Sequence, residues 1–146
     1  MEYLFTKEQT QFRESLQNFF RKHSPTSEVR RLMETQLGFD REVWKNACGS
    51  LGLSGIAIPE EYGGSGFGPV ELSIVCEEMG RSLYCSPFLG SVICAGSAIN
   101  LSSANEETKE QYLSRIASGE IIAALAVTEN KPMWGDENFV TAAMPI

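Results

Sequence analysis

The fold is decided by the stretch Ile58-Pro59-Glu60-Glu61-Tyr62-Gly63-Gly64-Ser65-Gly66, which separates two runs of residues with helical periodicity. Its glycines prevent a continuous helix, because glycine favours turns and loops over helix interiors. Adjacent carboxylates such as Glu60 and Glu61 could serve in acid–base chemistry only beside a second group and a buried pocket. The surrounding sequence offers neither. We therefore predict an exposed structural turn that joins the helices on either side.

Three helices are predicted before this turn. The first begins at Thr6, with Gln9 in the spacing of a capping box. Ser27 is expected to cap the second helix and Asp40 the third, which ends at Gly52. Their apolar residues recur at helical spacing and are expected to face one core: Phe12, Leu16, Phe19 and Phe20, then Val29, Leu32 and Met33, then Trp44, Ala47, Cys48 and Leu51.

Three more helices follow the turn, and a brief extended segment over residues 55–59 is predicted before it. The helices are expected from Pro69 to about Ser82, from residue 88 to 101, and from the N-cap Asn105. Because the 88–101 run is apolar or small on nearly every side, we place it at the centre of an up-and-down bundle. The residues expected to face inward elsewhere are Val70, Ile74, Val75 and Met79, then Tyr112, Leu113 and Ile116.

The chain changes character after Gly119. Residues 121–127 predict a buried strand, since they are short, apolar and flanked by helix breakers, and residues 140–144 predict a second. The sequence therefore indicates an all-α fold with the first strands of a truncated β domain at its C-terminus. We assign residues 1–120 to the helical domain and residues 121–146 to the incomplete β domain.

Composition excludes several classes of function. The 146 residues are 42% hydrophobic and carry a formal net charge of −7, typical of a globular protein and unfavourable for nucleic acid or anionic membranes. The richest apolar run, residues 88–99, is too short to span a bilayer. The N-terminus has no basic region followed by an apolar core, so no secretory signal is indicated and a cytoplasmic protein is expected.

Few side chains suit metal binding or nucleophilic chemistry. Cys48, Cys76, Cys85 and Cys94 lie far apart with no C-x-x-C pair, and no zinc site is predicted. All but Cys85 fall among apolar helix residues, where a thiol behaves as a small hydrophobe. The lone His23 is expected at a helix C-terminus, where it interacts with the helix dipole.

Three motifs in this order resemble the acyl-CoA dehydrogenase family over roughly residues 4–129. They are the Pro-Glu-Glu-Tyr-Gly-Gly turn, the helix end Glu77-Glu78-Met79-Gly80-Arg81, and Val127-Thr128-Glu129. The glutamates of the helix end are expected on a solvated face, not in catalysis. The resemblance implies a flavoprotein in which FAD takes a hydride from the β-carbon of an acyl-CoA after a base removes an α-proton, giving the 2-enoyl-CoA.

The resemblance also implies where the cofactor binds. It places the flavin contacts on Leu125, Val127 and Thr128, through backbone groups and the Thr128 hydroxyl. A threonine at a strand end can donate a hydrogen bond to a flavin ring nitrogen or carbonyl. The α-proton base belongs to parts of the family fold beyond this chain, so no catalytic residue is assigned here. Ser91 and Ser97 either line an acyl pocket or, as small residues, permit close helix packing.

The sequence departs from the family immediately after these contacts, and alternatives stay open. The family commonly continues T-E-P-x-x-G-S-D, whereas Asn130 stands in place of the proline and Trp134-Gly135-Asp136 lacks the serine. A non-catalytic partner subunit or interaction module, or an acyl-CoA oxidase or flavin monooxygenase, therefore also fits. Family members have three domains, so we expect this chain to be a piece of a longer enzyme. The resemblance further implies a homo- or hetero-oligomer that uses an electron-transfer flavoprotein or similar acceptor.

Overall fold

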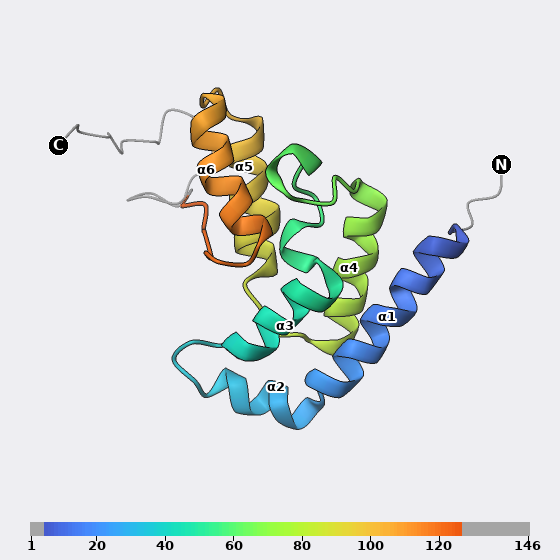
Figure 1. The fold of residues 1–146 in the computed structure, drawn as a ribbon. Coiled ribbons are helices and arrows are strands. Elements are labelled where there is room, and N and C mark those ends of the chain that lie inside the picture. Colours follow the sequence, from blue (N-terminus) through green and yellow to red (C-terminus); the bar gives the residue numbers. More distant parts are fainter. Residues whose placement is uncertain (1–4, 127–146) are drawn as a thin grey trace, which may run out of the picture.

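The computed structural model describes residues 5–126, and within that range the chain is helical (Figure 1). The predicted all-α bundle is confirmed. The elements are α1 Lys7–His23, α2 Thr26–Met33, α3 Arg41–Leu51, the 3₁₀ turns η1 Leu53–Gly55 and η2 Glu60–Tyr62, α4 Pro69–Ser82, the π-helix η3 Leu89–Gly96, α5 Ser97–Leu101 and α6 Glu106–Ala117.

Local sequence signals set most helix ends. Thr6 and Gln9 form a reciprocal capping box at the start of α1, with hydrogen bonds of 2.9 and 3.2 Å between side chain and backbone. Asp40 and Asn105 accept hydrogen bonds from backbone N–H groups in the first turns of α3 and α6. Gly52 ends α3 in the left-handed conformation, with φ of +65°. These boundaries are the ones expected from the sequence.

The helices pack in two groups, each around its own cluster of buried residues. In Figure 1, α1 and α4 lie side by side at one edge, α5 and α6 lie at the other, and α3 lies between them. The first cluster joins α1, α3, α4 and η3, and the second joins the η2 loop to α6. Their main members are Leu16, Phe20, Trp44, Ala47, Leu53, Ile56, Ile74, Val75, Phe88 and Val92, then Ile58, Tyr62, Leu113 and Ile116.

Several side chains expected to face inward are exposed. Met33, at the last residue of α2, is 72% exposed, and Val70 lies exposed in the first turn of α4, because terminal turns extend past their packing partners. Tyr112 lies one residue before the buried Leu113, so the helix rotates it away from the core. Cys76 is exposed as well, and Pro25, not Ser27, is the N-cap of α2.

The 88–101 run is neither a regular α-helix nor the centre of the bundle. Phe88, Val92 and Ala95 are buried, but Leu89 is exposed and Leu101 is 83% exposed. The run is wound as the π-helix η3 followed by α5, and it packs against α6 and η1. Only one face of it therefore belongs to the core, which corrects the expectation from its all-round apolar character.

A buried carboxylate joins α1 to α4: Glu77 is exposed, as expected for a solvated face, but Glu78 is buried, contrary to that expectation. The Glu78 side chain is 2% exposed, and its Oε1 lies 2.7 Å from Arg13 Nη1 and 3.1 Å from Gln17 Nε2. Arg81 approaches the other oxygen at 3.5 Å. A charge removed from water is tolerated only when it is paired and hydrogen-bonded. Glu78 therefore fixes the register of α1 against α4.

The glycine turn folds back on the residues that precede it. Instead of the extended segment expected over residues 55–59, the chain forms η1 and a tight turn. The N–H groups of Ser65 and Gly66 then donate to the carbonyls of Gly55 and Ile58 at 2.8 and 2.9 Å. A Cβ on Gly64 would collide with the Ile58 carbonyl and lie 2.7 Å from the Gly55 oxygen. The second glycine of the motif is therefore required by backbone contact.

Substituting Gly64 by alanine should destabilise the fold by at least about 2 kcal/mol, since rigid backbone must move to admit the methyl group. Gly49→Ala is the matched control, because nothing lies within 4 Å of a Cβ there and its helical position favours alanine by about 1 kcal/mol. Urea denaturation followed by circular dichroism measures both. Equal stability of the two variants would contradict the close backbone contact at Gly64.

Glu78→Ala should lower the free energy of unfolding by about 2–3 kcal/mol, because it leaves the Gln17 amide without its acceptor and Arg13 with only the half-exposed Glu77 carboxylate. Glu77→Ala serves as the control: that carboxylate also binds Arg13 at 2.7 Å, but half of its side chain is exposed. A much smaller loss is expected there, because solvent screens the exposed pair. Similar losses for the two variants would show that burial of Glu78 does not govern the α1–α4 contact.

Candidate functional site

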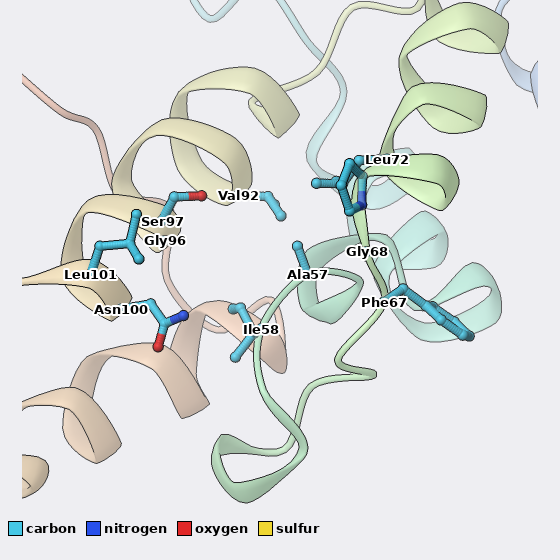
Figure 2. Close-up of a pocket in the computed structure, with 11 residues that line it drawn as sticks. Ala57, Ile58, Phe67, Gly68, Leu72, Val92, Gly96, Ser97, Asn100 and Leu101 are labelled. Carbon is cyan, nitrogen blue, oxygen red and sulfur yellow. The ribbon is translucent and has the colours of Figure 1, made fainter.

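An apolar hollow of about 460 Å³ opens between the glycine turn, the start of α4, and the η3–α5 helix. Figure 2 shows Ala57, Leu72 and Val92 converging on it from these three segments, whereas the Phe67 ring points away. The residues that line it are Ala57, Ile58, Phe67, Gly68, Pro69, Leu72, Val92, Gly96, Ser97, Asn100 and Leu101. Its polar side chains are the Ser97 hydroxyl and the Asn100 amide, both from α5.

The π-helical winding of η3 shapes this wall. A π-helix has more residues per turn than an α-helix and frequently occurs at functional sites. Here Val92 and Gly96 both line the hollow, and Ser97 follows at the start of α5. Ser97 thus occupies the position expected of a pocket-lining residue. Ser91 does not line it: its side chain is buried, and its Oγ accepts a hydrogen bond from the Ala123 N–H at 3.1 Å.

The segment after α6 leads toward the predicted flavin contacts. Residues 121–126 are irregular, with no strand pairing inside the described range, so the strand predicted over 121–127 is not formed there. The Ile121 N–H donates to the Arg115 carbonyl at 3.2 Å, and Leu125 is 46% exposed. Val127 and Thr128, like the second predicted strand, lie outside the described residues. The flavin role of these three residues stays a prediction.

Tyr62 connects the glycine turn to α6. Its hydroxyl donates to Glu106 Oε2 at 2.6 Å, and its ring packs with Ile58, Leu113 and Ile116 in the second cluster. The hydrogen bond to Glu106, helped by burial, raises the pKa of Tyr62 from its ordinary value of 10.0 to about 12. The sequence suggested a wholly exposed turn. This expectation is wrong for Tyr62, which is buried and holds Ile58 against the hollow.

Other candidate chemistry is sparse in the described part of the chain. Residues 5–126 contain no group of three His, Cys, Asp or Glu side chains placed to hold a metal ion. Within the same range, none of the helices has the length and apolar character needed to cross a membrane. His23 is the last residue of α1, and its ring lies 4.5 Å from that of Phe19.

Of the residues that line the hollow, the sequence indicates only Ser97 as a pocket-lining candidate. Ala57 and Ile58 come from a segment expected to be extended, and Asn100 carried no signal of its own. One signal was present: the 88–101 run has more apolar residues than a single buried stripe requires. The surplus lies partly in the hollow, at Leu101, and partly at the surface, at Leu89.

Comparison with known proteins shows the family to which these helices belong. The sequence model described as "Acyl-CoA dehydrogenase, N-terminal domain" matches residues 6–120. This chain belongs to the acyl-CoA dehydrogenase family. The acyl-CoA dehydrogenase IpdE2 of Mycobacterium tuberculosis is 31% identical over 130 residues, which cover 89% of this chain and 40% of that protein.

Solved structures of other proteins share the fold. The ChsE4–ChsE5 complex from Mycobacterium tuberculosis superposes with a TM-score of 0.75 at 26% identity, covering 85% of this chain and 34% of that one. An acyl-CoA dehydrogenase complexed with FAD from Bacillus anthracis gives 0.71 at 31% identity, covering 86% and 21%. This chain thus spans two fifths or less of the length of these relatives.

The Tyr62–Glu106 hydrogen bond predicts a pH dependence. The pKa of Tyr62 is higher in the folded protein than in the unfolded chain, so folding favours the protonated phenol. The resulting stability should be complete below pH 10.0 and lost as the pH rises toward about 12. Urea midpoints of the wild type and Tyr62→Phe, compared across this interval, measure it. The advantage of the wild type should shrink as pH rises, and a constant difference would contradict the hydrogen bond.

Proposed function

We propose that this chain is the N-terminal part of a flavin-dependent acyl-CoA dehydrogenase and forms the wall of the enzyme against which the acyl chain lies. The reaction is α,β-dehydrogenation of an acyl-CoA to the 2-enoyl-CoA. The observation that carries the proposal is the apolar hollow built by the glycine turn, α4 and η3 in a chain of this family. The helical domain over residues 1–120 and the β domain that starts at residue 121 are part of the same proposal.

The chemistry of the hollow suits an acyl chain. Val92, Leu72 and Ile58 offer an apolar surface, and burial of each methylene of a ligand contributes about 0.8 kcal/mol. Ser97 and Asn100 supply hydrogen-bonding groups on the α5 side, where a polar group of the ligand could be oriented. A charged ligand finds no ionisable side chain among the lining residues. The hollow therefore favours a neutral, elongated, largely apolar group.

The flavin contacts proposed for this chain are Leu125, Val127 and Thr128. Leu125 lies within the part of the chain that the structure describes and is exposed, so a ligand can reach it. When bound, FAD supplies the acceptor for the hydride. The residues of this chain would orient the ring through backbone hydrogen bonds and the Thr128 hydroxyl, while the Val92 and Leu72 side chains keep water from the acyl chain. The base that removes the α-proton is assigned to the remainder of the enzyme.

The remainder of the site is proposed to come from other parts of the enzyme and from a second subunit. The related ChsE4–ChsE5 structure is a complex of two differently named chains. We propose a homo- or hetero-oligomer for the complete protein and an electron-transfer flavoprotein or similar acceptor as its redox partner. By itself this chain should bind FAD weakly, because one wall of a site cannot offset the ordering cost of the ligand.

A second candidate function is a non-catalytic partner subunit with the same fold. It is favoured by Asn130 and by Trp134-Gly135-Asp136, which replace the proline and omit the serine of the family's T-E-P-x-x-G-S-D segment. Retention of Thr128 favours the enzyme. An oxidase or flavin monooxygenase of the same superfamily is distinguished by its electron acceptor, since either would reoxidise its flavin with O₂.

The flavin proposal is tested by the visible absorbance of bound FAD, measured for the isolated chain and for the assembly completed by its partner. The assembly should retain FAD, and Thr128→Val should weaken binding about two- to tenfold, since it keeps the shape but removes one hydrogen bond. Thr10→Val is the matched control, because the Thr10 hydroxyl donates only within α1, to the Thr6 carbonyl. A completed assembly that stays colourless after FAD reconstitution would favour the partner-subunit function.

A further inference from the structure

Ser91 is a buried polar residue that the proposed function has not used. It lies in the third position of η3, is 1% exposed, and neighbours Val92 in the wall of the hollow. Its Oγ accepts the hydrogen bond from the Ala123 N–H at 3.1 Å, across 32 positions of the chain. A serine hydroxyl buried in an apolar helix costs free energy unless it is hydrogen-bonded, so this contact also accounts for its tolerance there.

We propose that Ser91 is a positioning residue that fixes the chain leading to Leu125 and Thr128 relative to the wall of the acyl hollow. The assignment of roles to the hollow and to residues 125–128 rests on the proposed function, whereas the tether itself rests on the geometry. Residues 121–126 are irregular and have no strand partner in the described range. Their placement therefore depends on a few specific contacts.

Within residues 5–126, two hydrogen bonds hold the segment over residues 121–126. The Ile121 N–H donates to Arg115 at the end of α6, which fixes where the segment starts. The Ala123 N–H donates to Ser91, which fixes its direction and joins it to a different helix. Ile121 and Ala123 also pack against the second cluster, but apolar packing has no directional preference. The serine therefore specifies the orientation that packing leaves open.

Because Ser91 and Val92 are consecutive in η3, the tether and the wall of the hollow move together. A ligand that displaces Val92 displaces the oxygen to which Ala123 is bonded. The π-helix thus connects occupancy of the hollow with the position of the segment that enters the proposed flavin site. This connection requires the Ser91 hydroxyl, since the Ala123 N–H needs an acceptor at that point.

The first experiment measures amide hydrogen exchange of Ala123 by NMR in the 146-residue chain. Ser91→Ala should accelerate this exchange about three- to tenfold, because one hydrogen bond is lost while the packing around Ala123 remains. Ser91→Cys nearly preserves side-chain volume but offers only a weak sulfur acceptor, so it should accelerate exchange too. Ser82→Ala, which removes a hydroxyl bonded within α4, is the control and should leave Ala123 unchanged.

The second experiment adds octanoyl-CoA and follows backbone amide shifts, with free CoA as the control ligand. In the wild type, octanoyl-CoA should shift the amides of Val92, Gly96 and Ala123, and in Ser91→Ala the shift of Ala123 should be lost while those of Val92 and Gly96 persist. Shifts at Val92 and Gly96 without one at Ala123 in the wild type would overturn the coupling but leave the acyl site intact.

The two arms separate this inference from the proposed function. If octanoyl-CoA shifts none of these amides, the acyl site is contradicted, and the exchange measurement still decides whether Ser91 holds the segment. Unchanged Ala123 exchange in both Ser91→Ala and Ser91→Cys would overturn the tether. Equal acceleration in Ser82→Ala would overturn it as well, because the effect would then be a general loss of stability.

Discussion

The arrangement of this domain depends on a backbone contact that only glycine permits. At Gly64 the turn lies directly against the carbonyls of residues 55–58, and neighbouring N–H groups donate to those carbonyls. This closure presents Tyr62 to α6 and Ile58 to the hollow. The same contact that shapes the turn therefore joins the two groups of helices and builds one wall of the site. Packing geometry explains the glycine of the family motif.

The two groups of helices are held by different kinds of interaction. The α1–α4 contact combines apolar packing around Leu16 with the buried Glu78 carboxylate, whose partners Arg13 and Gln17 both come from α1. The contact between the turn and α6 is mainly apolar, with Tyr62 donating to a carboxylate that is itself largely exposed. A buried ion pair tolerates little displacement, whereas apolar contacts tolerate sliding. The hollow lies beside the second, less directional contact.

The hollow and the segment over residues 121–126 meet at η3. A regular α-helix has fewer residues per turn than a π-helix. If residues 88–101 formed one, the side chains of Ser91 and Val92 and the position of Gly96 would face in different directions. The π-winding lets one short element bury Phe88 in the core, line the hollow with Val92, and hold Ala123 through Ser91. The adjacent residues Ser91 and Val92 of η3 thus contact the segment after α6 and the hollow, respectively.

The sequence by itself determined most helix boundaries and the family. Thr6, Asp40, Asn105, Gly52 and Pro69 act through hydrogen bonds and backbone preferences that involve only a few neighbouring residues, so their patterns can be recognised without a structure. Tertiary structure alone decided the burial of Glu78, the exposure of Met33 and Tyr112, the π-winding of η3, and the hollow with its tether at Ser91. These features depend on which helix faces lie against each other. The hydrogen-bonded pairs Ser91–Ala123 and Arg13–Glu78, for example, are separated by 32 and 65 positions, and no local sequence pattern indicates such pairs.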